Sequence, residues 1–274
     1  MNEVDWNDLW RKAKLNSTWR KVFGDNDTVE YWNRRAESFN RNAGDKRGEL
    51  TVDKLVKLFG IDETSTVLDI GAGTGRLAIP LARVAKSVTA VEPSPEMMKF
   101  LKMNASAERL GNISFVQKRW GDAAAGKEIK KHDIVIACHS LSMMNIRNAL
   151  AKMNELCERY ACIYAFGGKR VWDFTNLWPR LYGEKFVPGP SYIYLVNLLY
   201  YMSINANVEI NKRKMERRYG NLDSAMEETK IKLDIRDDKK DGIIRKYLID
   251  TLQEENGELF HVKEFEEVMI WWEK

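Results

Sequence analysis

The chain has 274 residues, of which 44% are hydrophobic and 11% aromatic, so it is long enough for one large domain with a sizeable core, and general disorder is excluded. Lys and Arg number 44 against 40 Asp and Glu, and the charges are interspersed, which is typical of solvated faces rather than of a nucleic-acid-binding surface. The three cysteines include no Cys-x-x-Cys pair and the three histidines are scattered, which argues against a disulfide framework and a metal cluster. Neither a signal peptide nor an apolar run of the ~20 residues that span a membrane is visible, so we expect a soluble cytoplasmic protein.

Residues 1–50 are polar, rich in tryptophan and helical in pattern. Apolar residues recur at helical spacing from Trp6 to Ala13, and further helices are expected over 28–41 and 52–59. These residues predict a helical N-terminal cap.

Short apolar strands alternate with helices between residues 51 and 166. Strands are predicted over residues 67–70, 87–91, 113–116, 133–137 and 161–165. This alternation predicts parallel βαβ units in a doubly wound α/β sheet.

The pattern changes after the fifth strand. Residues 167–206 hold three prolines among many aromatic residues, and we interpret them as an insertion over the carboxyl edge of the sheet, with a helix near 192–202. Residues 207–274 predict a strand over 208–215, helices near 223–232 and 238–253, and a last strand that ends at Trp272. The whole chain is expected to form one domain.

A glycine-rich turn follows the first strand in Val67-Leu68-Asp69-Ile70-Gly71-Ala72-Gly73-Thr74-Gly75-Arg76-Leu77. Glycines at alternate positions let the backbone turn sharply and approach a ligand, and ligands of open α/β sheets bind beyond the carboxyl ends of the strands. Dinucleotide-binding loops more often place their third glycine where this chain has Arg76, and no Gly-Lys-Ser/Thr follows, so a triphosphatase loop is excluded. Glu92, at the end of the second strand, is placed to accept hydrogen bonds from two ribose hydroxyls.

These segments resemble the class I S-adenosylmethionine-dependent methyltransferases. VLDIGAGTGRLAIPLA is similar to the first motif of that family, VTAVEPSPEMMKFL to the segment after it, and NISFVQKRWGDA and DIVIACHSLSMM to the third and fourth strand motifs. The resemblance covers about residues 50–166, and YWNRRAESFN resembles an N-terminal element of many such enzymes. It implies a Rossmann-like sheet of seven strands, mostly parallel, with the last strand antiparallel.

The resemblance also implies roles for particular residues. S-adenosyl-L-methionine would be the cofactor and S-adenosyl-L-homocysteine the product. Gly71, Gly73 and Gly75 would line its methionine part, and Asp69 would orient its ammonium group. Glu92, followed by Pro93, would hold the ribose, and Asp122 the adenine amino group. Trp120 is a candidate stacking face, with core packing as its alternative.

Methyl transfer from a sulfonium is an in-line displacement that chiefly needs positioning and exclusion of water. A general base helps where the acceptor must lose a proton, and His139, after the fourth strand, is the candidate base and a candidate cofactor neighbour. A wall residue is its alternative role. Cys138 is disfavoured as a nucleophile because no Pro-Cys dipeptide is present, and Ala-Cys-His-Ser disfavours amino methylation of adenine, whose enzymes carry Asn/Asp-Pro-Pro-Tyr/Phe here.

The acceptor is predicted to be a small molecule bound beside the aromatic insertion. Tyr194, Asn197 and Tyr201 share one helical face there, and Tyr31 and Trp32 are candidates to close over the cofactor, with core packing as the alternative for all five. An RNA or protein methyltransferase is a second hypothesis, with a basic stripe of Arg34, Arg35, Arg41, Lys46 and Arg47. A non-catalytic S-adenosylmethionine-binding module is a third, and a nicotinamide dehydrogenase is disfavoured by the loop spacing.

Overall fold

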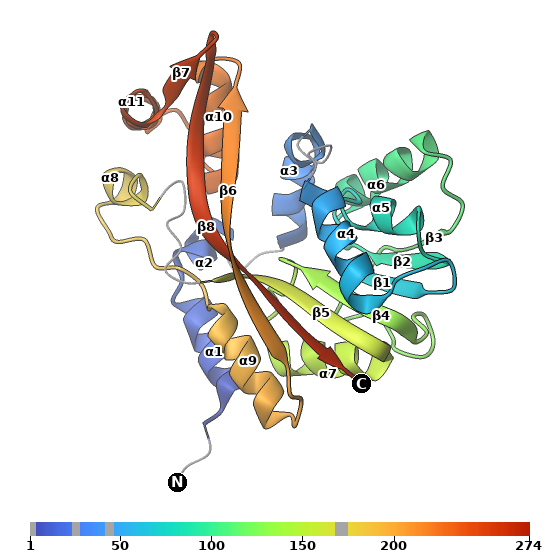
Figure 1. Ribbon diagram of the computed structural model, residues 1–274. Coiled ribbons are helices and arrows are strands. Elements are labelled where there is room, and N and C mark those ends of the chain that lie inside the picture. The colour runs from blue at the N-terminus through green and yellow to red at the C-terminus, as the bar shows by residue number, and fades with distance from the viewer. Residues whose placement is uncertain (1–3, 24–27, 42–46, 168–174) are drawn as a thin grey trace.

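The computed structural model describes residues 4–23, 28–41, 47–167 and 175–274, and shows a three-layer α/β domain from which a long β-ribbon projects (Figure 1). The strands are β1 (Thr66–Ile70), β2 (Ser87–Val91), β3 (Ile113–Val116), β4 (His132–Cys138), β5 (Cys157–Gly167), β6 (Asn207–Tyr219), β7 (Gln253–Glu255) and β8 (Glu258–Glu273). The helices are α1 (Trp6–Leu15), α2 (Thr18–Phe23), α3 (Thr28–Arg41), α4 (Arg47–Phe59), α5 (Ala78–Ala82), α6 (Pro95–Ala107), α7 (Ile146–Leu156), α8 (Trp178–Tyr182), α9 (Tyr192–Tyr201), α10 (Leu222–Leu233) and α11 (Asp241–Thr251).

The strands form one mixed sheet in the order β3-β2-β1-β4-β5-β8-β6. β1 to β5 are parallel, whereas β8 runs antiparallel between β5 and β6. The predicted doubly wound, mostly parallel sheet with an antiparallel last strand is therefore confirmed. The carboxyl ends of β1, β2 and β4 lie together at one edge, where a ligand of an open α/β sheet is expected.

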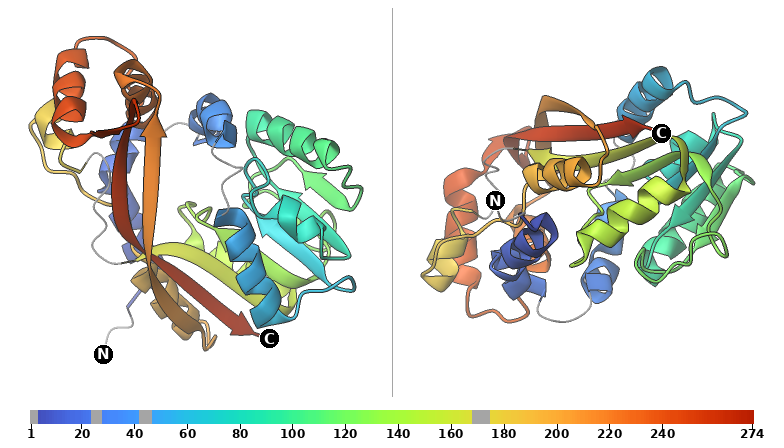
Figure 2. Two further views of the ribbon diagram at one scale, coloured as in Figure 1. Left: turned by 45° about the horizontal axis from the view of Figure 1, so that its top comes forward. Right: turned by 90° about the horizontal axis from the view of Figure 1, so that it is seen from below.

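Helices cover both faces of the sheet (Figure 2). Side chains such as Leu68 and Val135 pack with α1, α7 and α9 on one face. Their neighbours Val67 and Ile134 pack with α4, α5 and α6 on the other. Apolar residues at successive positions of a strand are expected when both faces of the sheet are buried.

The ribbon consists of the long partners β6 and β8, which stay paired after β5 has ended. β5 pairs with β8 only as far as Gly167, opposite Glu266, whereas β6 and β8 pair on to Tyr219 and Leu259. At the ribbon tip α2, α3, α8, α10 and α11 enclose a second, smaller core around residues such as Ala225. In Figure 1 this tip stands beside α3 and above the carboxyl edge of the sheet.

Two details of the sequence prediction differ from the structure. The sheet has eight strands rather than seven, because β7 pairs with β8 in a short hairpin around Asn256 and Gly257, both at positive φ. The insertion was expected over the carboxyl edge, but its helix α9 lies on a face of the sheet, where Leu195, Leu198 and Leu199 join the core beside α1. The buried leucines lie on one face of α9, whereas Ile193, Tyr200 and Tyr201 are exposed.

Candidate functional site

The glycine turn after β1 is held by the end of β2. The amides of Gly71 and Ala72 both donate to the carbonyl of Val91, at 2.7 and 3.1 Å. The buried carboxylate of Glu92 accepts from the Gly73 amide at 2.9 Å and from the Ser94 amide at 2.8 Å. Burial raises the pKa of Glu92, while the two amides act in the opposite direction. The acid predicted to hold a ribose therefore also fixes the shape of the turn.

Asp69 lies near the carboxyl end of β1, with only 2% of its surface exposed. Its Oδ2 atom is buried without a hydrogen-bond partner among the described residues. Burial, and after it the negative charge of Glu92, raises the pKa of Asp69 to about 7, while the charge of Arg76 and the Ala78 amide oppose the shift. A buried carboxylate with an unsatisfied oxygen is unfavourable by itself, so this site fits a ligand that brings a cation or a hydrogen-bond donor.

The three glycines of the turn meet different surroundings. A Cβ on Gly71 would lie 2.3 Å from Cβ of Ser140, and a Cβ on Gly75 would lie 2.5 Å from Cδ1 of Leu101. A Cβ on Gly73 would meet only Cε1 of Phe39, at 3.5 Å. Gly71 and Gly75 thus allow the turn to pack against the protein, whereas Gly73 faces the more open side beneath α3.

Helix α3 covers this side of the carboxyl edge. Oδ1 of Asn33 accepts from the hydroxyl of Ser94 at 2.6 Å. Nδ2 of Asn104 on α6 donates both to Oδ1 of Asn40 at 2.9 Å and to the Thr74 carbonyl of the turn at 2.8 Å. Polar contacts from the middle and the carboxyl end of α3 therefore fix it against α6 and the glycine turn. Sequence reasoning missed these asparagines, because no local pattern shows that their partners lie sixty residues away.

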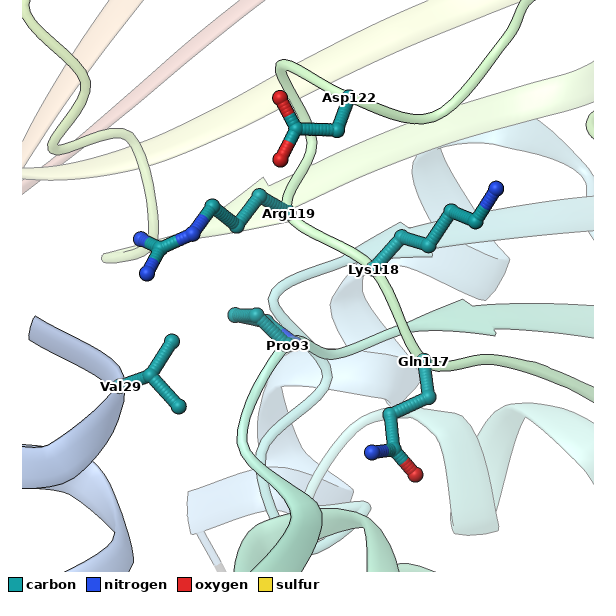
Figure 3. A pocket seen from close by; sticks show the side chains of 6 residues that line it. All are labelled: Val29, Pro93, Gln117, Lys118, Arg119 and Asp122. Carbon is teal, nitrogen blue, oxygen red and sulfur yellow. The ribbon is translucent and has the colours of Figure 1, made fainter. Parts of the chain in front are cut away.

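A pocket of about 390 Å³ opens between the first turn of α3 and the loops that follow β2 and β3 (Figure 3). It is lined by Val29, Pro93, Gln117, Lys118, Arg119 and Asp122. The structure thus brings Pro93 and Asp122 together next to Glu92, at the carboxyl ends of adjacent strands. A pocket of this size and position suits the base of a nucleoside.

His139 follows β4 at the same edge, in a left-handed backbone conformation with φ 54°. Its ring stacks on Phe166 with 4.0 Å between centroids, and its Nε2 lies 3.3 Å from Oε1 of Glu267 on β8. The next residue, Ser140, donates to the Ile70 carbonyl and abuts Gly71. His139 therefore stands beside the turn predicted to hold the methionine part of the cofactor.

Burial raises the pKa of the neighbouring Cys138 thiol to about 11, with Arg76 acting against the shift. A thiol is a nucleophile as its thiolate, so Cys138 is a weak candidate for covalent catalysis at neutral pH, as the sequence already suggested. The described residues contain no group of three or more His, Cys, Asp or Glu side chains arranged to hold a metal ion. Their helices are also too short or too polar to cross a bilayer.

Comparison with known proteins shows what part of the chain and its fold are similar to. Residues 67–159, which span β1 to the start of β5, match a family model described as a methyltransferase domain. The fold resembles the crystal structure of the YcgJ protein from Bacillus subtilis, with a TM-score of 0.58 and 16% identity over 82% of this chain and 98% of that one. Residues 67–159 are therefore similar to a methyltransferase domain.

Two relatives show how far the sequence similarity of this chain extends. An uncharacterized protein of Haemophilus influenzae is 24% identical over 177 residues, which are 65% of this chain and 64% of that protein. A 23S rRNA (uracil(1939)-C(5))-methyltransferase of Aliivibrio fischeri is 35% identical over 78 residues, which are 28% of this chain and 17% of that enzyme. The matched part of this chain spans less than two thirds of the length of either relative.

For one predicted cofactor contact, Trp120, the surroundings are those of the core-packing alternative. Trp120 was a candidate stacking face for adenine, but its ring is buried in the core, with Nε1 donating to the Ala149 carbonyl at 3.2 Å and the Lys152 amine 4.3 Å from the ring centroid. Trp120 anchors the loop to α7. Two residues later, Asp122 reaches the pocket instead.

The acceptor candidates lie in several environments. Tyr194 contacts the rings of Trp6 and Trp10 and packs against the core, Asn197 donates to the Ile193 carbonyl of its own helix, and Tyr201 is 44% exposed. Tyr31 is buried at the ribbon tip and donates to the Lys232 carbonyl at 3.2 Å. For these residues the core-packing or surface alternative describes their surroundings.

Trp32 differs from the other candidates because it approaches the glycine turn. Its ring lies edge-on to Phe39, with 6.0 Å between centroids, and Phe39 in turn faces Gly73. Trp172 and Phe174, which the sequence also placed in the aromatic insertion, lie outside the described residues. Trp178 and Tyr182 stack on each other at the ribbon tip.

Proposed function

We propose that this protein binds S-adenosylmethionine at the glycine turn and transfers its methyl group to a small-molecule acceptor. The observation that carries the proposal is the pair of buried acids at the ends of β1 and β2. The unsatisfied oxygen of Asp69 fits an ammonium group, and Glu92 fits the hydroxyls of a ribose. When bound, S-adenosylmethionine supplies a methyl group already activated by a positively charged sulfur.

The residues around that site would do the rest by binding and orientation. Gly73 leaves room beneath α3, Pro93 and Asp122 line the pocket suited to adenine, and Ser140 keeps the loop after β4 against Gly71. Holding donor and acceptor in a reactive arrangement can lower a barrier by about 7–11 kcal/mol, so this chemistry requires no metal or covalent intermediate.

Two features support a small molecule over RNA as the acceptor. Arg34 forms ion pairs with Glu30 and Asp234, and Arg41 pairs with Glu37. Arg35 lies over the rings of Tyr31 and Trp32. Arg34, Arg35 and Arg41 of the predicted basic stripe therefore have local partners. The similarity to the rRNA enzyme covers 78 residues, which are 28% of this chain and 17% of that enzyme.

Calorimetric titration with S-adenosylmethionine, S-adenosylhomocysteine and NADH tests the proposal. We expect micromolar binding of the two sulfur ligands and none of NADH. Glu92→Gln should weaken that binding roughly 10- to 100-fold, since a hydrogen bond to a charged group is worth about 1.5–3 kcal/mol. Glu96→Gln is the matched control, because Glu96 is exposed on the first turn of α6. Preference for NADH, or no binding of the sulfur ligands, would overturn the cofactor assignment.

A further inference from the structure

A cluster of charged and aromatic side chains joins the carboxyl edge to the root of the ribbon. Glu267 lies on β8 opposite Phe166, at the point where β8 leaves β5. One of its oxygens is 3.3 Å from Nε2 of His139, and the other accepts from Nε of Arg213 on β6 at 3.0 Å. The His139 and Glu267 side chains are 16% and 14% exposed, so their interaction is only partly screened by water.

We infer that Glu267, braced by Arg213, positions the imidazole of His139 and stabilises its protonated form, so that His139 can take the proton of an O–H or N–H methyl acceptor. The inference deepens the proposed function and rests on it. The acceptor atom would form a bond to the methyl carbon and lose its proton to His139, while the carbon–sulfur bond breaks and its electron pair remains on the sulfur.

The geometry restricts the ring in two ways. The stacked Phe166 fixes the plane of the imidazole, and the carboxylate fixes its rotation within that plane, since Nε2 must point toward β8. In addition, the backbone amide of His139 donates to the Tyr164 carbonyl at 2.9 Å, which holds the backbone from which the ring projects. Because Nε2 faces the carboxylate, the proton of the acceptor would be taken by Nδ1, which is buried in the ligand-free protein.

The charges around the imidazole favour its protonated form. Burial acts to raise the pKa of Glu267, but the hydrogen bond from His139 and the charges of His139 and Arg213 together hold it below its ordinary value. Glu267 is therefore ionised at neutral pH. The other titratable groups nearby are Cys138 on β4 and Tyr164 on β5, whose pKa values are raised by burial, so both are neutral there. The carboxylate is thus the charge that stabilises an imidazolium at this position.

This arrangement also narrows the acceptor class. An acceptor without a proton to lose, such as a thioether or a tertiary amine, gains nothing from a base, and its cationic product would be disfavoured beside an imidazolium. A hydroxyl or an amine N–H needs its proton removed as the new bond forms, and a positioned base contributes roughly 10²–10⁴-fold to such steps. The cluster therefore fits methylation of a hydroxyl or an amine.

The direct test is the titration of His139, followed by NMR of protein labelled in its histidine side chains. The chain has three histidines, so His139→Gln assigns the resonance by its disappearance. We expect Glu267→Gln to lower the pKa of His139 by about one unit or more, because an opposite charge at this distance favours the protonated form by that amount. Glu264→Gln removes the same charge from the exposed face of the same strand and should leave the titration unchanged.

Glu267→Asp keeps the charge on a shorter side chain and should shift the titration in the same direction by less, which provides the answer if Glu267→Gln does not fold. A His139 titration that Glu267→Gln and Glu267→Asp leave as in the wild type overturns the inference. The measurement is made without any cofactor, and S-adenosylmethionine binding is measured separately on the same variants. If the wild type does not bind S-adenosylmethionine, the proposed function is refuted. If it binds and the pKa of His139 is unchanged in the Glu267 variants, only the role of Glu267 is refuted.

Discussion

At the scale of single residues, the site combines two acids that disfavour each other's charge. Asp69 and Glu92 are both buried at the carboxyl edge, and the pKa of Asp69 rises to about 7 from its ordinary value of 3.8. Between pH 3.8 and about 7, Asp69 therefore keeps its proton in the folded protein and loses it in the unfolded chain. The stability that this neutral carboxyl contributes is present below about pH 4 and is lost as the pH rises through 7.

We therefore predict that Asp69→Asn stabilises the ligand-free protein at pH 8. The gain should be smallest near pH 4.5 and grow with pH, with an upper limit of about 4 kcal/mol set by about 1.4 kcal/mol per pKa unit. Urea unfolding of both proteins between pH 4.5 and 8 measures it. The same variant should bind S-adenosylmethionine more weakly, because an amide cannot balance the charge of an ammonium group. A variant no more stable than the wild type at pH 8 would show that Asp69 is not strained in the absence of ligand.

The sequence predicted the acids and glycines of the site correctly as a group at the carboxyl edge, because strand order and loop position alone bring them together. It did not decide which of Trp120 and Asp122 faces the pocket and which faces the core. Both follow β3 in a short loop, and which one faces the core depends on α7, whose Ala149 carbonyl accepts from the indole of Trp120. Glu267 could not be assigned either, since its neighbours Glu264 and Glu266 have the same charge and only the sheet register places it beside His139.

At the scale of elements, α3 packs against α6, and the side-chain amide of Asn104 on α6 links α3 to the glycine turn. Asn104→Ala would remove the donor that serves both Asn40 and the Thr74 carbonyl. We predict a loss of about 1–2 kcal/mol of stability, faster amide hydrogen exchange in α3, and several-fold weaker binding of S-adenosylmethionine. Met103→Ala, at an exposed position of α6, is the matched control for exchange and binding. Unchanged exchange in α3 would mean that the ribbon tip, rather than Asn104, holds this helix.

The elements of residues 51–166 were predictable because each strand is a short apolar run bounded by turns. The ribbon was not, because its length depends on pairing between segments some fifty residues apart in the chain, which alternation alone does not reveal. The strand predicted over 208–215 extends to Tyr219, and β8 has 16 residues. The Asn256-Gly257 pair was a recognisable hairpin pattern between Glu255 and Glu258, and it could have revealed β7.

At the scale of the whole molecule, the question is what the domain presents to an acceptor. A net charge of +4 over 274 residues attracts polyanions weakly. The arginines of α3 form ion pairs with neighbouring acids or lie over aromatic rings. An RNA-binding face needs cations that are available to phosphates, each of which would add to the salt dependence of binding. The charges on α3 therefore favour a small ligand over a polyanion that lies across the surface.

We accordingly predict that the protein binds ribosomal RNA weakly and with little dependence on salt. Filter binding with purified ribosomal RNA between 50 and 200 mM salt should show less than about a tenfold change in affinity, against roughly 10³–10⁵ for a protein that makes 6–10 phosphate contacts. Glu30→Gln combined with Asp234→Asn frees Arg34 from its two acidic partners and should strengthen the salt dependence. A wild-type protein that already binds tightly at low salt and releases at 200 mM would favour an RNA acceptor, and the cations responsible would then lie outside the arginines that α3 pairs internally.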